Sequence, residues 1–305
     1  MPGNCRPLVT ASWLRKRLGE PRLQVVDCRY KLGEPGAGER LYLEGHIPGA
    51  AYLDVDRDLA GPPGDRGRHP LPESDAFEAA ARGAGIGDDT LVVAYDEAGE
   101  GGAARLWWLL RHFGHDQVTV LDGGLRGWRE EGGELDTGAE ETVPGNFRAR
   151  QPETATAAAD ELAATLAEAT EPAAAEATEP AGGARRPPIV LDARVPERYR
   201  GEVEPIDRVA GHIPGARNLP FMELAPEGRF LPADELRARF EEVGVQSGGE
   251  AVAYCGSGVT ACVLVLAAEV AGIGPTRLYP GSWSEWSRRG MPVATSEPRL
   301  APRGG

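Results

Sequence analysis

A hexapeptide, GHIPGA, occurs twice in this chain, and the repetition constrains the fold more than any other feature of the sequence. Its copies span residues 45–50 and 211–216. Three further pairs of segments repeat in the same order: VVDCR at 25–29 with VLDAR at 190–194, VVAYD at 92–96 with AVAYC at 251–255, and LDGGLRGW at 121–128 with YPGSWSEW at 279–286. Four anchors in one order predict two copies of one domain. The length of 305 residues agrees, since it divides into two domains of about 150 residues.

Each copy alternates short apolar runs with segments of helical periodicity. We expect strands at 24–27, 90–95 and 118–121 in the first copy, and at 189–192, 250–254 and 277–279 in the second. Helices are expected at 103–113, 233–243 and 260–270. Continuous apolar strands separated by helices are typical of parallel sheets that are buried on both faces. The sequence therefore predicts an α/β fold of two tandem domains, each a mainly parallel sheet flanked by helices.

Composition places the domain boundaries. We expect the first domain at 1–135, a linker at 136–152 and the second domain at 153–305. Residues 169–188 form an Ala/Glu/Pro-rich tract that cannot bury enough apolar surface to offset the entropy of ordering it, so we expect a mobile surface insertion there. The first copy has seven more residues between GHIPGA and its next strand, and we place this extra length in the Gly- and Pro-rich loop 57–72.

Charge and cysteine usage exclude several classes of function. The chain carries 33 basic and 47 acidic residues, a net charge of −14, which disfavours nucleic acid and anionic membranes as partners. No apolar run approaches the roughly 20 residues that span a bilayer, and the opening segment lacks a secretory signal pattern, so we expect a cytoplasmic protein. The four cysteines form no CxxC pair and the five histidines are not clustered. We expect neither a disulfide framework nor a structural metal.

The third anchor ends differently in the two copies. The first strand delivers Asp96, whereas the second delivers Cys255, followed by the small residues 256–260 and an apolar helical segment. A strand, a tight loop and a helix start place the sulfur over backbone N–H groups, which favour an anion such as a thiolate. We interpret Cys255 as a nucleophile, with a small buried residue as the structural alternative.

These motifs resemble those of a known family. CGSGVTA at 255–261, the paired GHIPGA and Asp-x-Arg segments, DGGLRGW and GSWSEW are similar to the motifs of two-domain rhodanese sulfurtransferases, over nearly the whole chain except the insertion. The resemblance implies that Cys255 is the catalytic cysteine and that the first domain is a degenerate copy with Asp96 at its position. It also implies transfer through a Cys255 persulfide, without a cofactor, from a small-molecule donor to cyanide or to a thiol acceptor such as thioredoxin or a small thiol.

The residues after the cysteine bear on the donor. The family's thiosulfate enzymes have Arg and Lys there, whereas this chain has Gly256 and Ser257, and CGSGVTA is similar to the 3-mercaptopyruvate sulfurtransferases. The resemblance implies Arg198 as the arginine that binds the donor carboxylate, with Arg208 as the nearest candidate for a second one. A surface arginine is the structural alternative for Arg198. The remaining candidate donor-binding residues are those of the loop: Gly256, Gly258, Val259 and Thr260.

The same subgroup has an Asp, His, Ser relay that manages the thiol proton of the donor. By resemblance its members fall on Asp56, His69 and Ser257. His69 lies in loop 57–72, so a loop of the first domain would complete a site on the second. The structural alternatives are an exposed loop histidine for His69 and a turn residue for Asp56.

Three rival functions stay open. The first is the same fold and nucleophile with thiosulfate as donor. The second is a phosphatase, which we disfavour because the arginine of a CxxxxxR loop is replaced by Ala261. The third is a noncatalytic persulfide carrier or redox sensor, which would release no pyruvate over multiple turnovers.

Overall fold

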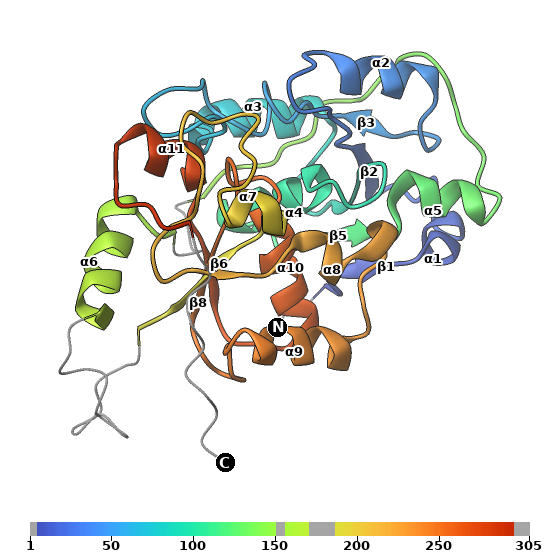
Figure 1. Ribbon diagram of the computed structural model, residues 1–305. Helices are drawn as coiled ribbons and strands as arrows, with labels where there is room; N and C mark the ends of the chain where they lie inside the picture. Colours follow the sequence, from blue (N-terminus) through green and yellow to red (C-terminus); the bar gives the residue numbers. More distant parts are fainter. Residues whose placement is uncertain (1–4, 151–155, 171–186, 296–305) are drawn as a thin grey trace.

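The protein folds around two separate parallel sheets, one in each half of the chain (Figure 1). The computed structural model describes residues 5–150, 156–170 and 187–295. Most of the predicted insertion at 169–188 therefore lies outside the described residues. A helix, α6 (Ala159–Thr170), lies in the described segment 156–170 that precedes the insertion, and the spacing of the apolar residues in this segment is helical.

The first sheet contains five parallel strands in the order β1-β5-β4-β2-β3. Its strands are β1 (Leu8–Val9), β2 (Leu23–Asp27), β3 (Ala51–Tyr52), β4 (Leu91–Tyr95) and β5 (Val118–Leu121). The helices of this half are α1 (Ala11–Arg15), α2 (Ala37–Glu44), α3 (Ser74–Gly83), α4 (Gly102–His112) and α5 (Gly124–Glu130).

The second sheet contains four parallel strands in the order β7-β6-β8-β9. Its strands are β6 (Ile189–Asp192), β7 (Arg217–Asn218), β8 (Ala251–Tyr254) and β9 (Thr276–Leu278). The helices that follow β6 are α7 (Pro196–Tyr199), α8 (Phe221–Leu224), the 3-10 turn η2 (Pro226–Gly228), α9 (Ala233–Glu242), α10 (Ala261–Ala271) and α11 (Ser282–Arg288).

The expected α/β fold of two tandem parallel-sheet domains is confirmed, and so are the six expected strands, to within a residue at most ends. The strands that the sequence did not predict, β1, β3 and β7, have two residues each, too few to show a periodicity. The domain boundaries at 135 and 153 stay predictions.

In each half a buried arginine joins two of the repeated anchors, because it pairs with the aspartate of its own segment and donates a hydrogen bond to the hexapeptide. Arg29 pairs with Asp27 at 2.6 Å and donates to the carbonyl of Gly45, the first residue of GHIPGA, at 2.7 Å. In the second copy Arg194 pairs with Asp192 at 2.6 Å and donates to Gly211 at 2.7 Å. Each Asp-x-Arg segment therefore fixes the hexapeptide against the end of its strand.

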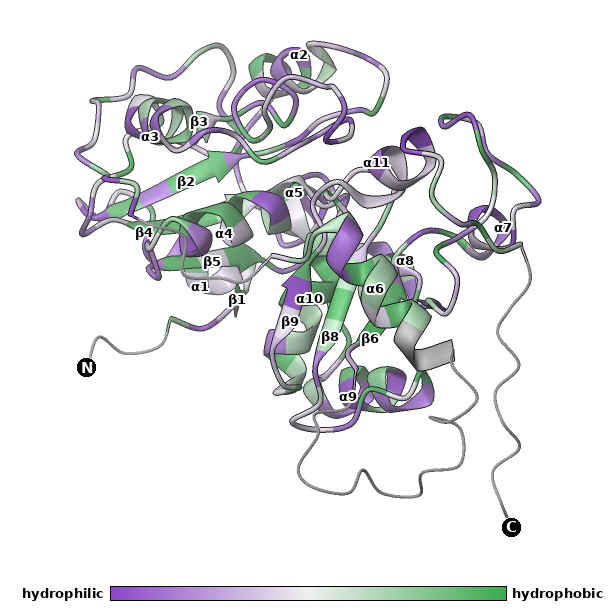
Figure 2. Cartoon of the chain, turned by 90° about the vertical axis from the view of Figure 1, so that its left-hand side faces the viewer, coloured by the Kyte–Doolittle hydropathy of each residue, from purple (hydrophilic) through white to green (hydrophobic). Residues whose placement is uncertain are grey.

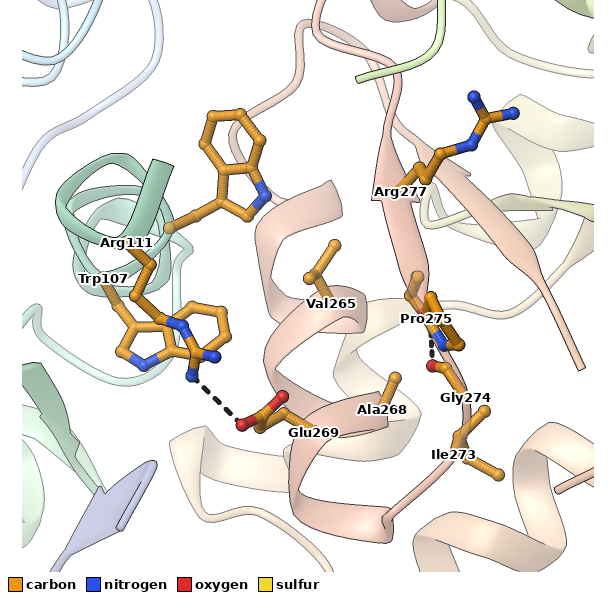
Figure 3. Close-up of a pocket in the computed structure, with 11 residues that line it drawn as sticks. Trp107, Arg111, Val265, Ala268, Glu269, Ile273, Gly274, Pro275 and Arg277 are labelled. Carbon is orange, nitrogen blue, oxygen red and sulfur yellow. Dashed lines mark hydrogen bonds and ion pairs between the residues drawn. The ribbon is translucent and has the colours of Figure 1, made fainter. Parts of the chain in front are cut away.

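Helices α4 and α10 pack against each other between the two sheets, and their apolar residues form one hydrophobic core with both halves (Figure 2). At one end of this seam a cavity of about 450 Å³ lies between the helices, bordered by the ion pair of Arg111 and Glu269 at 3.1 Å (Figure 3). None of the predicted site residues lines it.

Two features are absent from the part of the chain that the structure describes. No helix there combines the length and apolarity needed to cross a bilayer. The same residues contain no group of three or more potential His, Cys, Asp or Glu metal ligands.

Candidate active site

Cys255 lies at the end of β8, in the tight loop that leads into α10, and its side chain is buried. The backbone N–H of Gly258 donates to the Cys255 sulfur at 3.1 Å, while Ser282 Oγ accepts the N–H of Cys255 at 3.1 Å. Gly258 has a φ of +82°, and a Cβ atom built on it would lie 2.4 Å from the carbonyl oxygen of Pro280. Only glycine can therefore bring this N–H to the sulfur.

The other candidate loop residues have different surroundings. Gly256 is buried beside Cys255, and its carbonyl accepts the N–H of Ser284 at 2.9 Å. The Val259 side chain belongs to the hydrophobic core, so it could serve a donor only through its backbone. Thr260 packs against the first half of the chain. A Cβ atom built on Gly101 would lie only 3.0 Å from the Cα of Thr260.

The three residues of the expected relay form a hydrogen-bonded chain. His69 Nε2 lies 2.7 Å from Asp56 Oδ1, and His69 Nδ1 lies 2.7 Å from Ser257 Oγ. In the neutral imidazole, Nε2–H donates to the carboxylate and Nδ1 accepts from the serine hydroxyl. The hydrogen bond from His69 lowers the pKa of Asp56, so this carboxylate stays ionised to a lower pH than usual. His69 and Ser257 are buried, whereas Asp56 is 47% exposed.

Arg105, on α4, holds loop 57–72 against the catalytic loop. It is fully buried and donates to the carbonyls of Leu59 and His69, both at 3.2 Å, and of Pro70 and Gly258, both at 3.3 Å. Burial lowers the pKa of Arg105, because the charged form loses water. Sequence reasoning missed this residue, although an arginine within the apolar run of α4 was a visible signal.

Arg198, the expected carboxylate-binding arginine, lies over the catalytic loop. Its Nη1 lies 3.5 Å from the place that a Cβ atom built on Gly256 would take. Its Nη2 pairs with Glu204 at 2.6 Å, and Nε donates to the same carboxylate at 3.2 Å. Arg198 therefore has a fixed orientation and a free nitrogen, Nη1, on the side of Gly256.

Arg208 is exposed and lines a cavity of about 460 Å³ together with Arg68 and Asp207, and this cavity includes neither Cys255 nor Gly256. Arg68 also lies beside Gly256, since its Nη2 is 3.0 Å from the place that a Cβ atom on that glycine would take. Arg68 directly precedes His69 in loop 57–72, so the feature that singled out the loop could have pointed to it.

Cys262 is the other cysteine near the site. It lies on α10, fully buried, and its thiol donates to the carbonyl of Gly258 at 3.3 Å. Burial raises the pKa of Cys262 to about 12, so it stays a neutral thiol near pH 7. Its hydrogen bond therefore supports the loop of Cys255, and as a neutral thiol it is a poor nucleophile.

Comparison with known proteins gives the family. The model of the rhodanese-like domain matches this chain twice, at residues 10–131 and 174–289. The chain therefore belongs to the rhodanese family, with one family domain in each half.

Relatives match nearly the whole chain. The "Probable 3-mercaptopyruvate sulfurtransferase" of Pseudomonas aeruginosa is 46% identical over 95% of this chain and 98% of its own length. The "Putative thiosulfate sulfurtransferase SseB" of Mycobacterium tuberculosis is 43% identical over 92% of this chain and 93% of its own. The crystal structure of SseA of Escherichia coli, one of the 3-mercaptopyruvate sulfotransferases, matches with 35% identity and a TM-score of 0.74, over 92% of this chain and 99% of that one.

Proposed function

We propose that this enzyme is a sulfurtransferase that takes sulfur from 3-mercaptopyruvate onto Cys255, releases pyruvate, and passes the sulfur to a thiol or to cyanide. Sulfur transfer follows from relatives named as 3-mercaptopyruvate sulfurtransferases at 36–46% identity over most of the chain. The hydrogen-bonded chain of Asp56, His69 and Ser257 beside the cysteine carries the choice of donor, because such a chain can move the thiol proton that thiosulfate lacks.

In the first half-reaction the Cys255 thiolate attacks the sulfur of the donor. The new S–S bond forms as the carbon–sulfur bond breaks, and the electron pair of that bond passes to the carbon, giving the enolate of pyruvate. The donor's thiol proton moves through Ser257 and His69 to the enolate, so pyruvate leaves and a persulfide anion stays on Cys255. The amide of Gly258, 3.1 Å from the sulfur, supports the negative charge.

In the second half-reaction an acceptor attacks the outer sulfur of the persulfide. A thiolate becomes a persulfide and cyanide becomes thiocyanate, while the electron pair of the S–S bond returns to Cys255 as the thiolate. No electrons are taken from outside, so the cycle needs no cofactor. A small thiol or thioredoxin as acceptor, and a cytoplasmic location, stay predictions.

The decisive experiment measures sulfur on the protein and pyruvate in solution. After addition of 3-mercaptopyruvate, we expect intact mass to increase by one sulfur atom, with pyruvate release over many turnovers once a thiol is added. Cys255→Ser should give neither, while the control Cys5→Ser, whose cysteine precedes β1, should give both. Loading without repeated pyruvate release would support the carrier alternative, and loading by thiosulfate alone would overturn the choice of donor.

A second variant tests the relay. His69→Gln should lower turnover of 3-mercaptopyruvate by about 10²–10⁴-fold, because a positioned proton carrier contributes a factor of this size. Full activity of His69→Gln at every pH would remove His69 from the mechanism but leave Cys255 in place.

A further inference from the structure

The cavity of about 450 Å³ between α4 and α10 lies on the seam between the two halves of the chain (Figure 3). Its lining residues come from α4, from α10 and from the segment 273–277, which enters β9. The loop of Cys255 precedes α10, and Glu269, at the cavity, lies about 12 Å along this helix from its first residue, Ala261. The cavity is therefore separate from the candidate active site.

The walls of the cavity are mostly apolar, and two of them are indole rings. Trp107 and Trp108 of α4 contribute these rings, and each tryptophan is only 2% exposed. The other apolar lining residues are Val265, Ala268, Ile273 and Pro275. Cavities of a few hundred Å³ with aromatic walls are typical of sites for small molecules, and a flat ring can stack on the face of an indole. The walls therefore favour a ligand with an aromatic body.

One polar group of these walls is buried without a partner. Trp107 Nε1 is out of contact with solvent and has no hydrogen-bond acceptor among the described residues. A buried N–H group that donates to nothing keeps the full cost of losing its water. A ligand that carries an acceptor group beside this indole would offset that cost.

A cation lies over the same indole. The Arg111 guanidinium is 4.8 Å from the centre of the Trp107 ring, and it pairs with Glu269 of α10 at 3.1 Å (Figure 3). The side chains of Arg111 and Glu269 are 26% and 35% exposed, so water screens their ion pair and it contributes little to stability. An anionic group of a ligand can therefore replace the Glu269 carboxylate on Arg111. Trp107 and Arg111 together favour a ligand whose acceptor group is an anion.

We propose that this cavity is a second ligand site, which takes a small aromatic molecule with one anionic group such as a carboxylate. The ring lies against the indoles, and the anion accepts hydrogen bonds from Arg111 and from Trp107 Nε1. The proposal goes beyond the proposed sulfur transfer and does not depend on it. Because the ligand contacts both α4 and α10, it binds the folded protein and not the unfolded chain, and so it raises stability.

The probe is 2-naphthoate, a two-ring carboxylate, and its neutral control is 2-naphthamide. Titration calorimetry of the full chain should show one naphthoate site per chain with a Kd on the order of 0.1 mM. Naphthamide should bind about tenfold more weakly, because it lacks the charge that Arg111 meets. Naphthoate should raise Tm and leave the KM for 3-mercaptopyruvate unchanged, since it does not occupy the donor site.

Three variants place the probe in the cavity. Val265→Phe fills the cavity and should weaken the binding of both ligands at least about tenfold. Trp107→Phe keeps an aromatic ring but removes the N–H group, and should weaken naphthoate about tenfold. Glu269→Gln removes the carboxylate that competes for Arg111, and should strengthen naphthoate about threefold while leaving naphthamide unchanged. Because Glu269 is exposed, this variant keeps the proposal testable if either of the other two fails to fold.

The matched control is Arg17→Gln. Arg17 stacks over Trp13 at 4.7 Å and pairs with Glu20 at 2.9 Å, which is the same arrangement outside this cavity. Its loss should leave the affinity for both ligands unchanged.

Absence of saturable naphthoate binding would overturn the proposal, and so would equal affinities of the unmodified protein and the three cavity variants. Naphthamide that binds as tightly as naphthoate would overturn the anionic class of ligand. An increase in the KM for 3-mercaptopyruvate would place the probe in the donor site instead. The proposed sulfur transfer stands in each of these cases, because it is measured on Cys255 without the probe.

Discussion

The loop after β4 and the loop after β8 have the same backbone plan and opposite chemistry. Gly99 lies three residues after Asp96 and Gly258 three residues after Cys255, and their φ values are +80° and +82°. The N–H of Gly258 donates to the sulfur of Cys255 at 3.1 Å, and the N–H of Gly99 donates to the carboxylate of Asp96 at 2.7 Å. Each loop therefore turns an amide toward the side chain that ends its strand.

The difference lies in what occupies this cradle of amides. Asp96 also accepts the N–H groups of Gly101 at 3.0 Å and Ala103 at 3.2 Å, so its own carboxylate satisfies the donors that an external anion would need. The loop of Cys255 holds a sulfur instead, which in the proposed mechanism carries the negative charge, passes sulfur to the acceptor and becomes a thiolate again. The comparison teaches that one backbone arrangement can hold either a carboxylate that fills the loop or a sulfur available for chemistry, and that reactivity also requires the side chains around the sulfur.

The helices that follow the two loops differ in the same manner. Arg105 on α4 and Leu264 on α10 occupy the same place in the repeat, 159 residues apart, and both are fully buried. The arginine reaches across to loop 57–72 and the catalytic loop, whereas the leucine packs in the core. The first copy has thus become the support of the site on the second.

Exchanging the side chains of Asp96 and Cys255 should have the largest effect on sulfur transfer. Cys255→Asp should fold and lose sulfur loading by at least about 10³-fold, because the carboxylate takes the loop amide as Asp96 does and offers no nucleophilic sulfur. Asp96→Cys in a Cys255→Ser background should restore no pyruvate release, since His69, Arg68 and Arg198 lie beside the other loop. Intact mass and a pyruvate assay test both predictions. Turnover by a cysteine at position 96 would contradict the inference that the two loops differ in their surroundings.

Removing the buried Arg105 guanidinium should have the next largest effect, a loss of stability. Arg105→Met leaves four carbonyl groups without their donor and should cost about 2–4 kcal/mol of unfolding free energy, or roughly 5–15 °C in Tm. Arg111→Met is the matched control on the same helix, because its partly exposed ion pair with Glu269 should contribute less than about 1 kcal/mol. Calorimetry of both variants measures the loss of unfolding free energy. Equal losses in Arg105→Met and Arg111→Met would show that the hydrogen bonds of Arg105 do not stabilise the protein more than a surface ion pair does.

The smallest effect concerns the pH dependence of stability. Burial raises the pKa of Asp96, so the native protein keeps this proton to a higher pH than the unfolded chain does. The native state then binds more protons, and the contribution of Asp96 to stability falls as pH rises from about 4 through the raised value. Asp96→Asn should remove that part of the slope in denaturant unfolding followed against pH. An identical slope in the variant would contradict the raised pKa.

The sequence alone determined the repeat and the α/β class, and it gave the position at which we propose the nucleophile. These depend on local pattern: apolar runs fix strands, periodic segments fix helices, and an aligned pair of anchors exposes Cys255 against Asp96. Loop 57–72 also stood out by its extra length, and the family resemblance placed His69 within it. All of these features are visible in the sequence, because each lies within one segment or in two segments of similar sequence.

Only the tertiary structure decided which side chains surround the sulfur. The sequence offered Arg208 as the nearest candidate for a second arginine, and the packing of the two halves also brings Arg68 to Gly256. It likewise gives Arg105 its role, since the carbonyls that this residue binds come from both halves of the chain. Such contacts have no local signature, because they exist only after α4 and α10 bury their apolar faces against each other and fix the distance between residues far apart in sequence.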